Sequence, residues 1–158
     1  MSYTPIRDKL VDVLKTVPGI GNVHYRPRSA PFAGWEEFIR RHIKRGRVNT
    51  WEVSRPSVRS DLIAVGNAQG NQPFYHYTHT IRIRGGIGVR DAEDTNTDFH
   101  DVVDGILDAI RENVQLGGLL VLPMLFEAPV IGHAMFKRVL IHHAEFALTA
   151  VERTGGGS

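Results

Sequence analysis

Glycines stand between an alternating segment and a helical one, in an arrangement that resembles a phosphate-binding turn. Residues 74–84 alternate like a strand, Gly85, Gly86 and Gly88 follow, and residues 95–114 have the spacing of an amphipathic helix. A phosphate at a helix N-terminus needs unobstructed amides and a positive field. Carboxylates crowd that helix start instead: Asp91, Glu93, Asp94 and Asp98. The charges argue against a nucleotide site and leave a helix with an acidic outer face.

Histidines and serines are the other residues that could bind a metal or act as nucleophiles. His76 and His79 differ by three positions on a predicted strand and so face opposite sides, as do His142 and His143. The chain has no cysteine, no HExxH and no GxSxG turn. The helix carboxylates share an exposed face, where solvent leaves them too weakly perturbed for acid–base catalysis. We therefore expect no enzyme activity, no metal and no cofactor.

The composition indicates one folded domain. The chain has 158 residues, of which 42% are hydrophobic and 23% charged, enough to bury a core. The absence of cysteines excludes a disulfide framework and suits a reducing compartment. The longest apolar stretch, 116–126, is interrupted by glycines and a proline and is too short to span a bilayer. We expect a cytosolic origin, with neither a signal peptide nor a membrane span.

Charge is distributed unevenly along the chain, although the net charge is only +2. Residues 26–59 hold nine Lys or Arg against three Glu, and residues 91–112 hold eight acids against one Arg. A basic and an acidic surface on one chain suit head-to-tail association, in which each meets the other on a neighbouring copy. The alternative is two solvated surfaces that never meet, because surface charge seldom has a specific partner.

Two groups of charged residues are the predicted interface between subunits. The acidic group steps by three, four and four positions along one side of the helix: Asp101, Asp104, Asp108 and Glu112. Like charges at these spacings destabilise an isolated helix, so the face needs an outside reason. The basic group lies on a predicted short helix in an inserted arm: Arg40, Arg41, Lys44 and Arg45. We expect the arm to meet the acidic face on a neighbouring subunit or a partner ring.

The elements that position these groups follow from hydrophobic spacing. A first helix starts near Thr4, carries Ile6, Leu10 and Val13 on one stripe, and ends at Pro18. The remaining predicted elements are strands at 23–28, 48–54, 74–84, 119–122 and 139–151, the helix at 95–114, and a glycine-rich loop at 66–73, with 62–65 as a possible further strand. Pro56 is expected to end the strand that precedes it.

This order predicts an α+β fold: a mainly antiparallel sheet with two principal helices packed on one face, plus an inserted basic arm at residues 32–46. Residues 1–153 form the single domain, and residues 154–158 are expected to be a disordered, glycine-rich tail. The predicted core joins apolar helix residues to one face of the sheet. Its members are Phe99, Val103, Ile106, Leu107 and Ile110 on the helix, and Ile81, Ile83, Phe146 and Leu148 on the strands.

The layout resembles the tail terminator (tail completion) proteins of long-tailed bacteriophages. The likeness covers about residues 5–153 and lies in element order and local character, through the segments IRDKLVDVLKTVPGIGNV, NTWEVSRP, YTHTIRIRG, DFHDVVDGILDAIREN, LGG and VLIHHAEFALTAVER. It implies a non-enzymatic virion subunit, assembled in the host cytoplasm, that forms a homo-hexameric ring at the head-proximal end of the tail. Such a ring caps the tail tube protein and meets the head-side connector or head-closure protein, and DNA passes through its lumen without specific binding. The segments 32–46 and 57–73 have no counterpart in the resemblance.

Two other functions compete with this expectation. One is a nucleic-acid-binding module that uses the basic residues of 26–59, and the other is a different neck protein, such as a head-closure subunit. Salt separates the first from a ring, because duplex binding would lose orders of magnitude in affinity between low and moderate salt.

Overall fold

The computed structural model describes residues 3–25, 47–64, 74–90, 93–136 and 138–154. The arm with Arg40, Arg41, Lys44 and Arg45, the loop at 66–73 and residues 155–158 of the predicted tail lie outside the described residues. Thr154, the first residue of the predicted tail, is instead the last residue of a strand. The elements, in chain order, are α1 (Tyr3–Lys15), β1 (Asn22–His24), β2 (Asn49–Ala64), β3 (Phe74–Gly88), α3 (Thr95–Glu112), η2 (Leu116–Gly118), β4 (Leu125–Phe126), β5 (Val130–Phe136) and β6 (Val139–Thr154).

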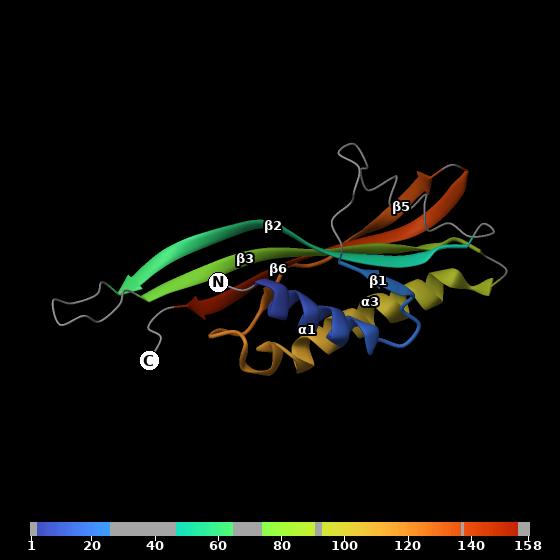
Figure 1. Cartoon of the computed structure of the whole chain (residues 1–158). Coiled ribbons are helices and arrows are strands. Elements are labelled where there is room, and N and C mark those ends of the chain that lie inside the picture. The colour runs from blue at the N-terminus through green and yellow to red at the C-terminus, as the bar shows by residue number, and fades with distance from the viewer. Residues whose placement is uncertain (1–2, 26–46, 65–73, 91–92, 137, 155–158) are drawn as a thin grey trace.

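The strands form one sheet in the order β1-β2-β3-β6, and β4 and β5 pair with successive parts of the outer edge of β6. β1 runs parallel to β2, and the other described pairs are antiparallel. Both α1 and α3 lie on the same side of this sheet (Figure 1). The α+β fold with a mainly antiparallel sheet and two helices is therefore confirmed.

The core lies between the sheet and the two helices. Alternate side chains of β3 and β6 point toward the helices, and Ile81, Ile83, Phe146 and Leu148 are all buried. α3 contributes Phe99, Val103, Ile106 and Ile110, which are also buried, while Leu107 packs against the cluster at its margin. α1 adds a stripe of its own, formed by Ile6, Leu10, Val13 and Leu14. The predicted core is confirmed, with Leu107 less deeply placed than the rest.

Carboxylates crowd the start of α3 partly because one of them caps the helix. Asp94 is the N-cap residue, and its Oδ1 accepts hydrogen bonds from the backbone N–H and the hydroxyl of Thr97. The hydroxyl of Thr95 accepts the backbone N–H of Arg90 at 2.7 Å, which ties the end of β3 to the helix. Asn113 ends the helix two residues short of the predicted end, with its amide bonded to the carbonyl of Ala109.

Pro56 does not end a strand, so that expectation is wrong. β2 continues to Ala64 through a break in register between Ser54 and Ser57. β1 pairs only with Thr50, Trp51 and Glu52, and beyond them β2 is an edge among the described strands. A proline lacks the N–H that a neighbouring strand would need, but a bulge on an edge does not require it.

The glycines after Arg84 also belong to a strand rather than to a turn. Gly85 pairs with Trp51 on β2 and with Ala144 on β6, and a Cβ at Gly85 would lie 2.3 Å from the indole ring. That ring is fully buried, and its Nε1 donates to Oδ1 of Asn49 at 3.1 Å. The glycine therefore makes room for the tryptophan against the backbone of β3.

We expect Gly85→Ala to lower the free energy of unfolding by about 1–3 kcal/mol or more, the range for overpacking a filled core. The added methyl group would meet both the Trp51 ring and the carbonyl oxygen of Thr50, at 2.6 Å. Denaturant unfolding followed by tryptophan fluorescence measures the change. Gly132→Ala is the matched control, because the nearest atom to its Cβ is 3.8 Å away and its cost should stay within about 0.5 kcal/mol. Equal costs at the two sites would contradict the steric explanation.

The segment 119–122 is not a strand, contrary to expectation. Leu116, Gly117 and Gly118 all have positive φ angles, so the chain turns sharply here. Leu116 and Leu120 are buried and close one end of the core. The strand that pairs with the start of β6 is instead β5, which the sequence analysis did not predict. A two-residue connection joins it to β6, since Phe136 pairs with Val139.

Candidate subunit interface

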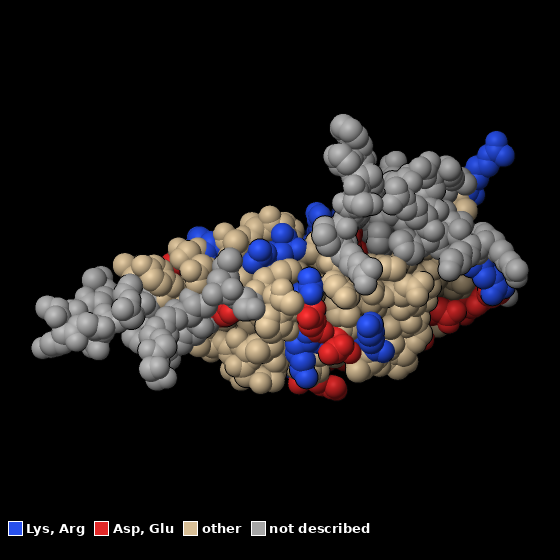
Figure 2. Space-filling model, viewed as in Figure 1, with Lys and Arg blue, Asp and Glu red and all other residues tan. Residues whose placement is uncertain are grey.

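The acidic residues predicted for an interface line one side of a surface groove. Asp101, Asp104, Asp108 and Glu112 are exposed along α3, opposite its buried stripe. The groove has a volume of about 450 Å³, and its other wall is the turn that follows α1, at Thr16, Val17 and Pro18. Figure 2 shows acidic side chains over the helical side of the molecule.

The groove exists because the turn after α1 approaches α3 closely at its floor. A Cβ at Gly105 would lie 2.7 Å from Cγ1 of Val17, so only glycine allows this contact. Val17 and Ala109 are buried there and give the groove an apolar base. The result is an apolar floor between carboxylates, a surface suited to a basic segment with an apolar stem.

Little within the described chain neutralises this face. Arg111 approaches Asp108 at 3.4 Å, and both side chains are more than 60% exposed, so the pair is weak. The Arg111 guanidinium also lies 5.8 Å from the centre of the Phe126 ring. The described residues form no ion pair with Asp101, Asp104 or Glu112. The acidic half of the predicted interface is therefore a largely uncompensated exposed face, whereas the basic half lies outside the described residues.

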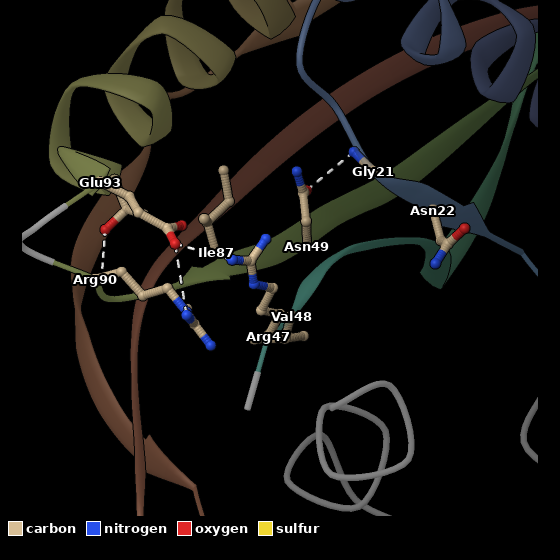
Figure 3. A pocket seen from close by; sticks show the side chains of 10 residues that line it. Gly21, Asn22, Arg47, Val48, Asn49, Ile87, Arg90 and Glu93 are labelled. Carbon is tan, nitrogen blue, oxygen red and sulfur yellow. Dashed lines mark hydrogen bonds and ion pairs between the residues drawn. The ribbon is translucent and has the colours of Figure 1, made fainter. Parts of the chain in front are cut away.

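A second hollow, of about 540 Å³, lies where the start of β2 meets the end of β3 (Figure 3). Two guanidiniums converge there on Glu93: Nη2 of Arg47 lies 2.9 Å from Oε1, and Nη1 of Arg90 lies 3.5 Å from it. Asn49 bridges to the connection between α1 and β1, since its Oδ1 accepts the Gly21 N–H at 2.9 Å and its Nδ2 donates to the carbonyl of Gly19. The polar groups of this hollow bind one another, so we assign it to holding the start of α3 against the sheet.

Large apolar side chains are exposed at both ends of the sheet. On the β5–β6 hairpin, Met135 and Leu140 are cross-strand partners, 63% and 38% exposed, and Val130 is 65% exposed. On the far part of β2, Leu62 and Ile63 are each more than half exposed. The two strand ends lie at opposite ends of the molecule: the far part of β2 extends past the helices, whereas the β5–β6 hairpin rises on the side of the sheet away from them (Figure 1). Contiguous exposed apolar surface is typical of interaction sites, and Leu122 and Leu125 are also exposed, outside these two groups.

Hydrophobic spacing predicts neither apolar group. It predicts no element over residues 130–136 and only a possible further strand at 62–65. A signal was present in the first case, because two apolar runs flank a two-residue connection at residues 137 and 138.

Across residues 3–25, 47–64, 74–90, 93–136 and 138–154, no group of three or more His, Asp or Glu side chains could hold a metal ion. The helices of the same ranges include none that is long and apolar enough to cross a membrane. Comparison with known proteins adds no assignment, since no family model and no curated protein sequence matches this chain.

Proposed function

We propose that this chain is a structural virion protein, the subunit of a tail terminator ring that caps the tail tube and joins it to the head-side connector. The observation that most supports this proposal is the exposure of large apolar side chains at opposite ends of one sheet. A subunit that presents different contact surfaces at its two ends forms heterologous interfaces, which generate rings when the rotation closes. The sixfold number comes from the family resemblance.

The apolar groups would supply the affinity between neighbouring copies. Fully burying a side chain such as Met135 or Leu62 contributes about 1.5–3 kcal/mol relative to leaving it exposed. Charged faces contribute register and orientation more than affinity. In this division, the hairpin and the far part of β2 hold subunits together, and the acidic face of α3 sets how they meet the basic arm.

The ring acts by geometry rather than by chemistry. A growing tube exposes a repeating subunit edge, and a ring that matches this edge on one face but differs on the other ends the repeat. One face would meet the tail tube protein and the other the head-side connector or head-closure protein. DNA would pass through the lumen without specific binding, and the protein would reside in the virion, at the head-proximal end of the tail.

A nucleic-acid-binding module is the second candidate, and it would use the basic residues of 26–59. Of the three described arginines in this range, Arg47 pairs with Glu93, and Nε of Arg59 lies 3.0 Å from Oδ2 of Asp61. Both pairs are exposed and therefore weak, so the salt dependence of binding separates this candidate from a ring.

We expect the purified chain, or the chain on its tail, to form a closed ring of six copies, and Met135→Glu to prevent it. A carboxylate placed in an apolar contact would have to be desolvated without a partner. Light scattering and class averages of negatively stained particles measure the oligomeric state. Gln115→Glu adds the same charge at an exposed position outside the two apolar groups and should leave the ring intact.

Measurements at raised salt and at high protein concentration can contradict the ring proposal. A ring held by apolar contacts should survive a rise in salt that would abolish duplex binding. A chain that stays monomeric at high concentration and is also monomeric in assembled particles would exclude the proposal. Retention of the ring by Met135→Glu would remove the hairpin from the interface.

A further inference from the structure

A third hollow, of about 270 Å³, lies between the start of α1, the residue after β1 and the bulge of β2, and the ring proposal gives it no role. It is lined by Tyr3, Arg7, Tyr25, Glu52, Val53, Ser54 and Arg55. Each of its two arginines stacks on one of its tyrosines: Cζ of Arg7 lies 4.4 Å from the Tyr25 ring centre, and Cζ of Arg55 lies 4.5 Å from that of Tyr3. The arginines are thus held in defined positions.

A buried histidine helps to orient Arg55. His79 has no exposed surface, its Nε2 lies 2.9 Å from Oε2 of Glu152, and its Nδ1 lies 3.4 Å from Nη1 of Arg55. A guanidinium can only donate hydrogen bonds, so we assign Nδ1 as the acceptor and Nε2–H as the donor to Glu152. The hydrogen bonds from Arg55 to His79 and from His79 to Glu152 therefore fix one side of the guanidinium. The remaining N–H groups of Arg55 are left to bind a ligand in the hollow.

The charges of this hollow leave one positive charge without a carboxylate. Arg7 pairs with Asp8, at 2.7 Å, and Glu52 pairs with Arg84, at 3.0 Å. The interactions of Arg55 within the described chain are those with His79 and the Tyr3 ring, and neither supplies a negative charge to the guanidinium directly. Arg55 is therefore the cation that a ligand would meet.

Tyr3 adds a hydrogen-bond donor. Its hydroxyl is buried, and no described residue bonds to it. Burial raises the pKa of Tyr3 above its ordinary value, against the opposing effect of Arg55, so the hydroxyl keeps its proton at neutral pH. The oxygen has almost no accessible surface, so a ligand in the hollow reaches it only when the Tyr3 ring shifts. A buried hydroxyl without a partner is costly in the folded protein, which favours such a shift toward a ligand oxygen.

We propose that this hollow binds a single carboxylate group presented by a peptide or protein partner, held by the Arg55 guanidinium and the Tyr3 hydroxyl. The planar guanidinium matches the two oxygens of a carboxylate, and the hydroxyl can donate to one of them. One uncompensated positive charge fits a monoanion better than a phosphate dianion. The volume suits a side chain or a chain terminus. This inference does not depend on ring formation.

The test uses the full-length protein and two small carboxylates, N-acetylglycine for a chain terminus and N-acetylglutamate α-amide for a side chain. The Nε–H signal of Arg55, assigned by its loss in Arg55→Lys, is followed by NMR at constant ionic strength, with inorganic phosphate as a competitor. We expect a saturable chemical-shift change with at least one of the two carboxylates. The more tightly bound compound shows whether the site takes a chain terminus or a side chain.

Variants separate binding from structure. Binding to Arg55→Lys, followed through the neighbouring backbone amides, should be at least tenfold weaker, because an ammonium lacks the planar fork. Tyr3→Phe should weaken it severalfold while the melting temperature stays equal or rises, since the hydroxyl it removes has no partner. Arg59→Lys is the control, because Arg59 is exposed and already paired with Asp61, and it should change nothing. A shift that does not saturate, tighter binding of phosphate, or full binding by both Tyr3→Phe and Arg55→Lys would overturn the proposal.

Discussion

Phe146→Ala and Ile106→Ala are each expected to lower the free energy of unfolding by on the order of 2 to 4 kcal/mol, through loss of burial and formation of a cavity. Both side chains have no exposed surface, and they lie in one cluster, Phe146 on β6 and Ile106 on α3. The surrounding sheet cannot collapse onto the space, because Ile81, Ile83 and Leu148 are fixed by strand pairing. Denaturant unfolding with an unchanged m value measures the loss.

An exposed residue provides the comparison for this core prediction. Leu122 is 52% exposed, so Leu122→Ala removes much less buried surface and should change stability by no more than about 1 kcal/mol. If Phe146→Ala cost no more than Leu122→Ala, the helix and the sheet would not share this core.

Reversing Asp104 and Asp108 to lysine is expected to weaken ring assembly by about tenfold or more, because like charges placed opposite each other cost several kcal/mol. The lysines would face the arm residues Arg41 and Arg45 of the neighbouring copy. Adding Arg41→Glu and Arg45→Glu should restore assembly, because the arm and the helix then carry opposite charges again, with the signs exchanged. The concentration at which rings form, measured by light scattering, reports both steps.

The same reversal should not destabilise the subunit itself. The new lysines stand at helical spacing from Asp101 and Glu112, so two repulsive pairs become attractive ones worth a few tenths of a kcal/mol each, while the weak pair of Arg111 with residue 108 becomes repulsive. Loss of assembly with an equal or higher melting temperature therefore separates docking from folding. Reversing Asp12 and Glu127, which are exposed and do not line the groove, controls for net charge. If the reversal is harmless, or the arm changes fail to restore assembly, the acidic helix is only a solvated surface.

The family resemblance and the two surface proposals differ in what supports them. Ring formation rests on element order and on exposed apolar groups, the acidic face on charge along α3, and the carboxylate site on the contacts of Arg55. A result against ring formation would also remove the docking role of the acidic face, whereas the carboxylate site is tested independently.

The sequence alone determined the elements that repeat with a local period. The stripe on α3 and the alternation of β3 and β6 predicted the core, because burial of one face imposes spacings of 3.6 and 2 residues directly on the chain. The same reasoning placed the acidic residues on the exposed side of the helix. It also gave the α+β class, since an alternating sheet face of that length needs a helical cover.

Only the tertiary structure decided features that depend on a distant partner. Pro56 is tolerated because β1 covers just the first part of β2, and Gly85 belongs to a strand because Trp51 fills the space where its Cβ would lie. The contacts of His79 join residues 24 and 73 positions away, to Arg55 and Glu152. No local pattern records such contacts, because strand order and packing bring these residues together only after the chain has folded.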